Sequence, residues 1–389
     1  MWVSSTTEYA LEHPNSPLGR LTYRALGDTF ENASTGPTLV APNRVYVGPL
    51  NYAGQGHLWA RALREEFADV DAVNAAVVSP RSPLNFPTDI EIPLRVYRGS
   101  EEWRAQQKTY LRRFTHVIAE SGRSLLGERR NSDAFDELAA LRTDGVTTAV
   151  LLHGSDARLP SRHSQANANS PFHDLRRHKG AESRVRRLLE RLENFAGPVF
   201  VSTPDLLVDV PWAEWCPVVV DSQRWTAKQP PLARDVPIVV HVPSRAAVKG
   251  TDLIEPAARQ LDAEGLISYR RIEGISPARL PDILKTADIV LDQFAIGSYG
   301  VAACEAMAAG RVVVGHVTNT VRDAVTNSTG MELPIIQAEA NDVGSVLRHI
   351  VSHRQEANGT AERGTEFVAT VHSGQLSARV MAKSLHFAE

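Results

Sequence analysis

An arginine and a lysine four positions apart, Arg245 and Lys249, lie in the segment HVPSRAAVKGT, directly after a predicted buried strand at 238–242. A guanidinium group can bind two oxygens of one anion side by side, whereas an ammonium group acts as a compact positive charge. At the carboxyl end of a strand, this pair suits a diphosphate. Because basic residues are common in loops, the interpretation depends on a second anion site nearby.

Such a site is predicted further along the chain, in the stretch IVLDQFAIGSYGVAACEAMAAGRVVVGHV. Apolar residues at 289–291 predict a strand, a Gly/Ser loop follows, and an Ala-rich helix ends before Gly310, a typical C-cap. The free N–H groups at the start of such a helix attract anions. Glu305 is the one carboxylate of this helix, and if it is buried it needs partners, such as sugar hydroxyl groups. The alternative is a glutamate that faces solvent.

A glycine-rich loop, GPLNYAGQGHLW, follows a predicted strand at 45–47. Asn51, Gly54 and Gln55 precede a predicted helix, so backbone N–H groups there could meet an anion or a hydroxyl-rich ligand. The three-glycine spacing of a dinucleotide fingerprint is absent. The loop is therefore either a ligand-binding loop or a plain strand-to-helix turn.

Polar residues also follow the predicted strand at 148–152, where His153, Ser155 and Asp156 come in close succession. Open α/β sheets place their chemistry at the carboxyl ends of strands, so these residues are candidates for a site. The alternatives are a hydrogen-bonded histidine at a strand end and a loop or capping aspartate. Ser155 with His153 would suit a hydrolase, but the G-x-S-x-G pattern around such a serine is missing.

Strands and helices alternate on both sides of a Pro-containing segment at 222–235, which predicts a linker. We therefore expect two doubly wound parallel sheets, that is, two Rossmann-like domains facing each other across a cleft. Their expected ranges are 41–221 and 236–374, after an N-terminal extension at 1–40, with a C-terminal helix at about 375–389 packing back on the first domain. Further strands are predicted at 73–78, 116–119, 199–202, 218–220 and 267–272, further helices at 18–26, 58–67, 134–141, 181–195, 252–263, 278–285 and 345–353, and a polar loop at 157–180.

Composition limits the classes of function. The net charge of −3 over 389 residues argues against a general nucleic-acid binder. Cys216 and Cys304 are too few for a disulfide framework and predict buried thiols in a reducing cytosol. The chain shows no signal peptide and no apolar run long enough for a membrane span. We expect a cytoplasmic protein, with peripheral contact of the Arg-rich helix 181–195 at the inner face of the membrane as an alternative to a solvated helix face.

Two segments carry a resemblance to a known family: VPSRAAVKGTDLI, and ISPARLPDILKTADIVLDQFAIGSYGVAACEAMAAGRVVV. Together they resemble the donor-binding domain of retaining, nucleotide-sugar-dependent glycosyltransferases of GT-B fold. The shared pattern is a basic loop, an ADIVL strand, a short Gly loop, an E-A-M-A-x-G helix and a Val-rich strand, over about 236–330. The loops GPLNYAGQ and HGSD look like the acceptor-side loops of these enzymes.

The resemblance implies roles for individual residues. Arg245 and Lys249 would hold the donor diphosphate and stabilise the leaving group, and Glu305 would accept hydrogen bonds from the ribose hydroxyls. His153 could bind the sugar, and Asp156 could receive the acceptor proton or orient His153. The implied donor-binding residues are Arg245, Lys249, Ile275, Gln293, Ser298, Tyr299, Gly300, Val301 and Glu305, and the implied acceptor or sugar loops contain Asn51, Gly54, Gln55, His153 and Ser155.

One position departs from the family pattern. The motif Glu-x7-Glu would place its first glutamate, which contacts the transferred sugar, at Gly297. Asp292, Gln293 and Tyr299 are the nearest residues that could replace it. The departure leaves the donor sugar open and raises a second hypothesis, a GT-B-like subunit that binds a nucleotide-sugar without transferring it.

The resemblance also implies the substrates. A nucleotide-sugar donor and a carbohydrate or glycan acceptor are expected, with neither a cofactor nor a metal, because Arg, Lys and a helix N-terminus would neutralise the diphosphate. Transfer would retain the anomeric configuration without a protein nucleophile. Closure of the two domains about the linker would exclude water from the reacting centre.

Overall fold

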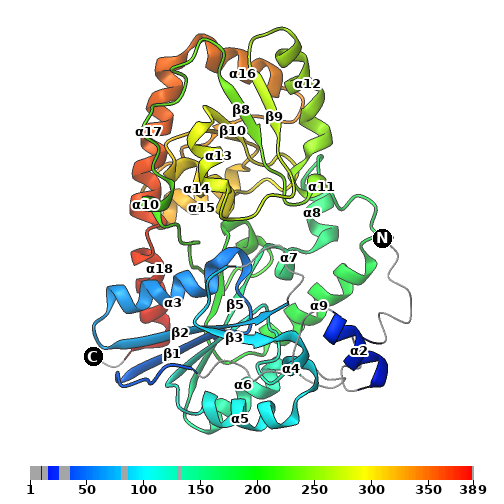
Figure 1. Ribbon diagram of the computed structural model, residues 1–389, viewed down its shortest axis with the longest axis vertical. Helices are drawn as coiled ribbons and strands as arrows, with labels where there is room; N and C mark the ends of the chain where they lie inside the picture. Colours follow the sequence, from blue (N-terminus) through cyan, green and yellow to red (C-terminus); the bar gives the residue numbers. More distant parts are fainter. Residues whose placement is uncertain (1–9, 11–15, 26–35, 80–85, 129–132, 388–389) are drawn as a thin grey trace. The chain divides into compact units, whose positions relative to one another are not determined.

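The structure is a computed structural model that describes residues 10, 16–25, 36–79, 86–128 and 133–387 (Figure 1). Packing divides the chain into two compact units. The first unit comprises Met1–His153, Arg191–Phe200 and Ala378–Glu389, and the second comprises Gly154–Glu190 and Val201–Ser377. The chain contains a seven-stranded and a five-stranded sheet, so the predicted architecture of two parallel α/β sheets is confirmed.

The seven-stranded sheet has the order β3-β2-β1-β4-β5-β6-β7. Its strands are β1 Asn43–Gly48, β2 Val70–Val78, β3 Ile90–Pro93, β4 His116–Glu120, β5 Thr147–Leu152, β6 Val199–Val201 and β7 Glu214–Trp215. β1 pairs in parallel with both β2 and β4, so the direction of winding reverses between β1 and β4. Ligands of open α/β sheets bind at the carboxyl edge beside such a reversal.

The five-stranded sheet has the order β12-β11-β10-β8-β9 and lies in the second unit. Its strands are β8 Ile238–His241, β9 Ser268–Arg271, β10 Ile289–Leu291, β11 Val312–Gly315 and β12 Ile336–Gln337, and every neighbouring pair is parallel. Here the winding reverses between β8 and β10. The loops after these two strands therefore meet at one edge, and they are the loops that carry Lys249 and Asp292.

The helices connect and cover these strands. Up to the start of the second sheet they are α2 Pro17–Ala25, η1 Tyr52–Gly54, α3 Gln55–Glu66, α4 Leu94–Gly99, α5 Glu101–Leu111, α6 Ala134–Thr143, α7 Gly154–Ala157, α8 Pro160–Ala166, α9 Lys179–Glu193, η2 Pro204–Val208 and α10 Ser222–Trp225. From there on they are α11 Ala246–Lys249, α12 Thr251–Ala263, α13 Leu280–Thr286, α14 Val301–Ala308, α15 Asn319–Thr329, α16 Val343–Ser352, α17 Arg354–Val371 and α18 Gln375–Leu385.

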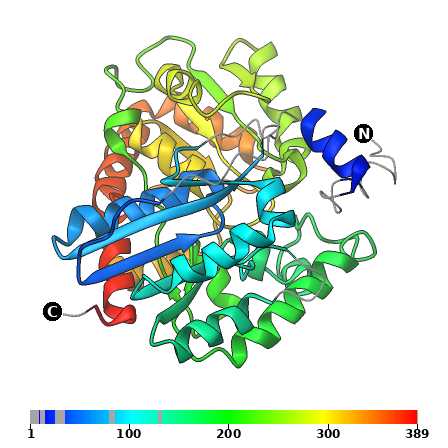
Figure 2. The same ribbon diagram turned by 60° about the horizontal axis from the view of Figure 1, so that its bottom comes forward.

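Helix α3 lies over β1 and β2 (Figure 2). Trp59 and Leu63 bury their side chains fully at this contact. The helix can begin against the sheet edge because its second residue is Gly56. A Cβ atom there would lie 2.4 Å from Asn74 Nδ2 and 2.9 Å from Glu120 Oε2, so a larger residue would push α3 away from both side chains.

The core of the second unit forms where β8, β10 and β11 pack against α12, α16 and α17. Val239, Ile289, Leu291 and Val312 are each exposed by 1% or less, as expected of strands covered on both faces. α14 packs against α17, where Gly364 lets the two helices approach: a Cβ atom there would lie 3.3 Å from Met307 Cβ.

Some predicted elements differ from the structure. The apolar segment predicted as a strand at 218–220 is buried but joins no sheet, because Val220 N donates to His372 O and Val218 O accepts from His372 Nδ1, both within the second unit. The polar loop predicted at 157–180 contains α8. The segment predicted as a linker contains α10, which packs against α13 and α14.

The predicted domain boundaries differ from the division by packing. Residues 154–190 and 201–221 belong to the second unit, whereas the sequence placed them in the first domain. The C-terminal residues from Ala378 belong to the first unit, where Arg379 Nε is 2.6 Å from Glu66 Oε1 and His116 contacts Phe387. The expected N-terminal helix is α2, while 1–9, 11–15 and 26–35 of the predicted extension lie outside the described residues.

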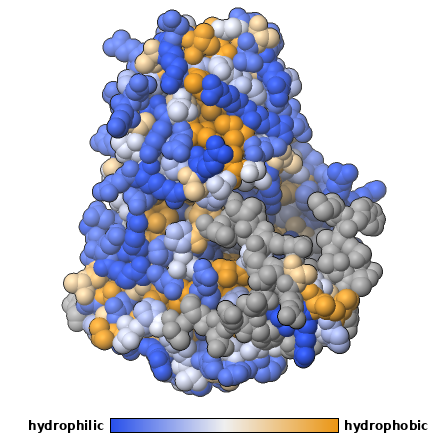
Figure 3. Space-filling model, viewed as in Figure 1, coloured by the Kyte–Doolittle hydropathy of each residue, from blue (hydrophilic) through white to orange (hydrophobic). Residues whose placement is uncertain are grey.

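The described part of the chain holds no helix with the length and apolar character needed to cross a membrane. On the face drawn in Figure 3, hydrophobic residues lie in separate patches among hydrophilic ones.

The start of β10 depends on Asp288, which is fully buried. Its carboxylate accepts hydrogen bonds from Leu232 N at 2.8 Å and Ile238 N at 2.7 Å, and it lies 3.0 Å from Arg234 Nη1. The substitution Asp288→Ala would leave two backbone donors without partners, so we expect a loss of about 3 kcal/mol in the free energy of unfolding, measured by urea denaturation. The exposed Asp282→Ala is the control; an equal, small effect of both substitutions would contradict this account.

Candidate functional site

The first candidate site lies at the carboxyl edge of the five-stranded sheet, between β8 and β10. Lys249, the last residue of α11, forms an ion pair with Asp292, the residue after β10. Both side chains are largely buried, with exposed fractions of 12% and 3%. Lys249 O also accepts a hydrogen bond from Phe294 N at 3.0 Å, so the two loops are joined by backbone as well as by charge.

A buried histidine fixes the same two loops. His241, the last residue of β8, donates from Nδ1 to Leu291 O and accepts at Nε2 from the Thr251 hydroxyl, each at 2.8 Å. Burial lowers its pKa, which keeps the ring neutral and suited to one donor and one acceptor contact. Gly250 lies between α11 and α12 with φ +71°, and a side chain there would press against Ala295.

Glu305 lies in the second turn of α14 and is partly buried. Desolvation raises the pKa of its carboxyl to about 8, against the opposing influence of Arg224 and Lys249, while Asp292 raises the pKa further. Within the described ranges, no hydrogen bond or ion pair to this carboxyl is present. Glu305 is thus a partly desolvated acid close to two cations, which is the setting expected of a group that binds ligand hydroxyls.

The N-terminus of α14 provides backbone donors at this edge. The N-cap is Gly300, which has no side-chain cap, and the space where its Cβ atom would lie is open. Val301 is partly exposed at the first helical position. An α-helix leaves its first N–H groups without partners in the helix, so this end can receive an anion.

The side chains before Gly300 turn inward. Gln293 donates from Nε2 to Ser298 O, and both residues are buried. Tyr299 is 2% exposed, and its hydroxyl lies 3.4 Å from His372 Nε2. Of the residues predicted in this loop, Ser298 and Tyr299 therefore offer a ligand their backbone rather than their side chains.

Gly297 is buried and has φ +75°, a conformation that favours glycine. A Cβ atom there would lie 2.7 Å from Thr318 Cγ2. A glutamate at this position would need a different loop, so the departure from the family motif is built into the local packing.

Three side chains from outside the five-stranded sheet hold this loop within the second unit. His163 Nε2 donates to Ile296 O at 3.0 Å, and Asn167 Nδ2 donates to Ala295 O at 3.1 Å. Asp205 lies near the Ser298 side chain and forms an ion pair with Arg158, and although desolvation raises the pKa of this largely buried carboxyl, its contacts hold the pKa below its ordinary value. The segments that follow β5 and β6 thus position the loop that precedes α14.

The remaining predicted donor residues lie in partly open positions. Arg245 is exposed at the N-cap of α11, and its side chain makes no ion pair with any residue that the structure describes. Ile275 is partly exposed in the loop after β9. Arg224 on α10 donates to Pro277 O in that loop at 2.8 Å and lies near enough to Glu305 to lower its pKa. Sequence reasoning missed Arg224 because its segment resembles a linker.

A second candidate site lies in the first unit, beside the reversal between β1 and β4. His153 Nε2 is 3.2 Å from Glu120 Oε1, and Glu120 is fully buried at the end of β4. The imidazole stacks on Trp59, with ring centroids 5.7 Å apart, and meets the Tyr52 ring edge-on. Sequence reasoning missed Glu120, although a carboxylate at the end of a predicted strand is the same signal that drew attention to His153.

The glycine-rich loop after β1 is fixed by Asn74 from β2. Asn74 Nδ2 donates to Val47 O and Leu50 O, at 3.1 and 2.9 Å. Asn51 accepts from His57 N at 3.1 Å and so helps to begin α3. Gly54 takes the left-handed conformation, with φ +77°, and the buried Gln55 follows as the first residue of α3.

The other residues predicted after β5 belong to the second unit, in the short helix α7. Ser155 is exposed and Asp156 is half-buried. Gly154 precedes them, and a side chain on it would meet the Arg158 guanidinium at 3.1 Å.

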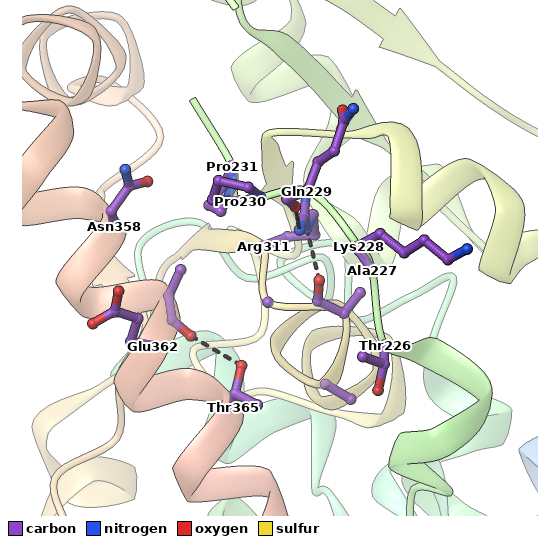
Figure 4. Close-up of a pocket in the computed structure, with 14 residues that line it drawn as sticks. Thr226, Ala227, Lys228, Gln229, Pro230, Pro231, Arg311, Asn358, Glu362 and Thr365 are labelled. Carbon is purple, nitrogen blue, oxygen red and sulfur yellow. Dashed lines mark hydrogen bonds between the residues drawn. The ribbon is translucent and has the colours of Figure 1, made fainter. Parts of the chain in front are cut away.

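Figure 4 shows a pocket of about 250 Å³ between α17 and the segment before β8. Asn358, Glu362 and Thr365 line one side and Lys228 to Pro231 the other, with Arg311 at the base, where its guanidinium donates to Gln229 O at 2.6 Å. Arg311 precedes β11, so this pocket lies at the amino edge of the sheet, opposite Lys249 and Asp292. In the parts of the chain that are described, no group of three or more His, Cys, Asp or Glu is arranged to hold a metal ion.

No known family model matches this chain, and no curated protein sequence matches it. Solved structures do match. HepE of Anabaena, in complex with UDP and glucose, aligns with a TM-score of 0.55 and 11% identity over 89% of this chain and 100% of that chain. Sucrose-phosphate synthase of Thermosynechococcus elongatus aligns with a TM-score of 0.55 and 13% identity over 88% and 98% of the two chains.

An alpha-glucosyltransferase in complex with UDP and a 13-mer DNA aligns with a TM-score of 0.56 and 9% identity, over 88% of this chain and 98% of that chain. At such low sequence identities, the structural similarity establishes the fold alone. Together with the two parallel sheets, they confirm the predicted GT-B-like fold.

The raised pKa of Glu305 predicts a pH dependence of stability. Between the ordinary carboxyl pKa and about 8, the folded chain binds more protons than the unfolded chain at this residue, so its contribution to stability falls as pH rises through this window. Glu305→Gln removes the titration. We expect its free energy of unfolding, relative to the wild type, to increase by about 2 kcal/mol from pH 5 to pH 9, after allowing for partial solvent screening. A difference that does not change with pH in urea titrations would contradict the burial of this carboxyl.

Proposed function

We propose that this protein is a glycosyltransferase that moves a sugar from a nucleoside diphosphate sugar to an acceptor hydroxyl, with retention of anomeric configuration. The observation that carries the proposal is the group of charges at the reversal between β8 and β10. Lys249 and the N-terminus of α14 offer positive charge, and Glu305 offers a partly desolvated carboxyl beside them. The likeness of the fold to structures that contain UDP adds support.

Each part of this edge has a role in the proposed reaction. Lys249 and Arg245 neutralise the diphosphate, and the N–H groups of Gly300 and Val301 bind its oxygens or the sugar. Glu305 binds the ribose hydroxyls, and Ile275 lies where backbone atoms would meet the base. As the bond between the sugar C1 and the phosphate oxygen breaks, the electron pair goes to the diphosphate, where fixed positive charge stabilises it.

The acceptor oxygen then forms the new bond to C1 on the face that the diphosphate leaves, and the acceptor proton passes to the departing phosphate oxygen. We assign the Glu120–His153 pair and the loop with Asn51, Gly54 and Gln55 to recognition of the sugar and the acceptor. Glu120 acts as a positioning residue, because its buried carboxylate orients the imidazole. Asp156 orients the acceptor or takes part in the transfer of its proton.

The proposal includes a carbohydrate or glycan as the acceptor, a reaction without cofactor or metal, and a cytoplasmic location with the inner face of the membrane as an alternative. The net charge of −3 supports an acceptor other than nucleic acid, although one similar structure contains DNA. The exposed arginines of α9 support peripheral membrane contact as the alternative to a purely soluble protein.

Gly297 motivates a second candidate function, a nucleotide-sugar-binding subunit without catalytic activity. The packing around Gly297 leaves no room for the carboxylate that contacts the sugar in the family motif. Binding without turnover over a broad range of acceptors, including water, would favour this candidate over the transferase.

A thermal-shift screen with UDP, GDP, dTDP and their sugars tests the proposal. A ligand that binds only the folded chain raises its melting temperature, and at saturation we expect a rise of about 5 °C for one nucleotide class. Lys249→Ala should weaken the binding of that nucleotide diphosphate about tenfold or more, because a charge-assisted contact is lost.

Lys228→Ala is the matched control, since Lys228 is an exposed lysine at the opposite edge of the sheet and should leave the affinity unchanged. If none of the nucleotides shifts the wild-type melting temperature, the proposed function is wrong. If both lysine substitutions weaken nucleotide binding equally, Lys249 is not part of the binding site.

Retention and metal independence are tested together by following hydrolysis of UDP-glucose by proton NMR in excess EDTA. Under the proposed mechanism the first sugar released is the α anomer, as in the donor, and the rate is the same with and without EDTA. Early release of the β anomer would show inversion. Loss of activity in EDTA that magnesium restores would show that a metal is required.

A further inference from the structure

Three side chains surround the position that a side chain at Gly297 would occupy. A Cβ atom there would lie 2.7 Å from Thr318 Cγ2, 3.4 Å from Asn167 Nδ2 and 3.5 Å from His316 Nε2. Of the two polar atoms, Asn167 Nδ2 already donates to Ala295 O. His316 Nε2 makes no hydrogen bond within the part of the chain that the structure describes.

His316 is held firmly at the carboxyl edge of the sheet. It directly follows β11, the neighbour of β10, and its backbone N donates to Gln293 O at 2.9 Å. Its Nδ1 lies 3.0 Å from Glu339 Oε1 and 3.1 Å from Gln337 Nε2. The side chain is 12% exposed, so the ring is fixed at Nδ1 and keeps limited access to solvent.

These contacts set the chemistry of the free nitrogen. A neutral imidazole carries one proton, and the two groups beside Nδ1 need opposite roles from it, because the Glu339 carboxylate accepts whereas Gln337 Nε2 donates. Nε2 is therefore an acceptor when the proton lies on Nδ1 and a donor when it does not. A hydroxyl group both donates and accepts, so Nε2 can hydrogen-bond it in either tautomer. A carboxylate at position 297 would also hydrogen-bond a hydroxyl group, so His316 offers the same kind of contact without a negative charge.

We propose that His316, oriented by Glu339, is a specificity-determining residue that hydrogen-bonds a hydroxyl group of the transferred sugar in place of the glutamate absent at Gly297. The inference rests on the proposed function, because it needs a nucleotide-sugar at this edge. The inference names the side chain that would recognise the sugar, which the motif does not identify in this chain. Glu339 is a positioning residue, since it acts through His316.

The test compares a nucleotide with its sugar derivative. Binding constants for UDP and for UDP-glucose, and for GDP and GDP-mannose, are measured for the wild type, His316→Ala and His316→Gln, together with the KM of the active donor. We expect His316→Ala to raise the Kd and KM of the sugar donor about tenfold and to leave the Kd of the free nucleotide within about twofold. His316→Gln keeps both a donor and an acceptor atom and should restore most of the loss.

Glu339→Gln provides a second variant with little risk to folding, because Glu339 is about half exposed. It should raise the donor KM about threefold and leave nucleotide binding unchanged, since it weakens only the hold on Nδ1. The exposed His353→Ala is the control for loss of a histidine and should change neither constant.

Two results would overturn the inference while the proposed function stands. In the first, His316→Ala weakens the binding of nucleotide and of nucleotide-sugar equally, which would mean that His316 only supports the folded structure of this edge. In the second, the substitution changes neither binding constant. If the wild-type chain binds no nucleotide at all, the proposed function fails first and the role of His316 fails with it.

Discussion

The ion pair between Lys249 and Asp292 joins the two strands at which the winding of the five-stranded sheet reverses. Parallel strands on either side of such a reversal send their next helices to opposite faces, which leaves an open crevice at the carboxyl edge. A buried charge pair in that crevice is costly unless both partners are well held. Here His241 and the hydrogen bond from Phe294 N to Lys249 O hold the two loops, so the ammonium group stays at the edge.

Charge at this edge is unbalanced in a way that suits an anion. Lys249 and Arg224 lie near two carboxyl groups, Asp292 and Glu305, and Glu305 is largely protonated at neutral pH because its pKa is raised to about 8. The helix dipole of α14 adds further positive potential. An incoming diphosphate would meet donors already in place, and Glu305 would gain hydroxyl partners in exchange for lost solvation.

The sequence predicts much of the fold because its signals are local. Apolar runs mark β8, β10 and β11, glycine marks the C-cap after α14, and the order of basic loop, strand, Gly loop and helix between Arg245 and Glu305 indicates alternating strands and helices. The contacts that decide the details are not local. His163 and Asn167 reach the loop before α14 from residues more than a hundred positions away, and no periodicity in the sequence indicates that contact.

The sequence also does not show in which direction a side chain points. Tyr299 and Asp292 were both possible substitutes for the missing glutamate, but Tyr299 is buried against His372 and Asp292 is engaged by Lys249. The sequence does not indicate His316, because the approach of this side chain to Gly297 depends on the pairing of β10 with β11 and on a positive φ at Gly297. The place of Glu120 beside the start of α3 is likewise set by the packing of β4 near that helix, which the sequence does not indicate.

The most direct test is a crystal structure of the protein soaked with the nucleoside diphosphate that stabilises it most. The account predicts difference density for the diphosphate within hydrogen-bonding distance of Lys249 Nζ and the N–H groups of Gly300 and Val301, with the ribose at Glu305. Density for the nucleotide in the pocket beside Arg311, or anywhere else away from the carboxyl edge of the five-stranded sheet, would contradict it.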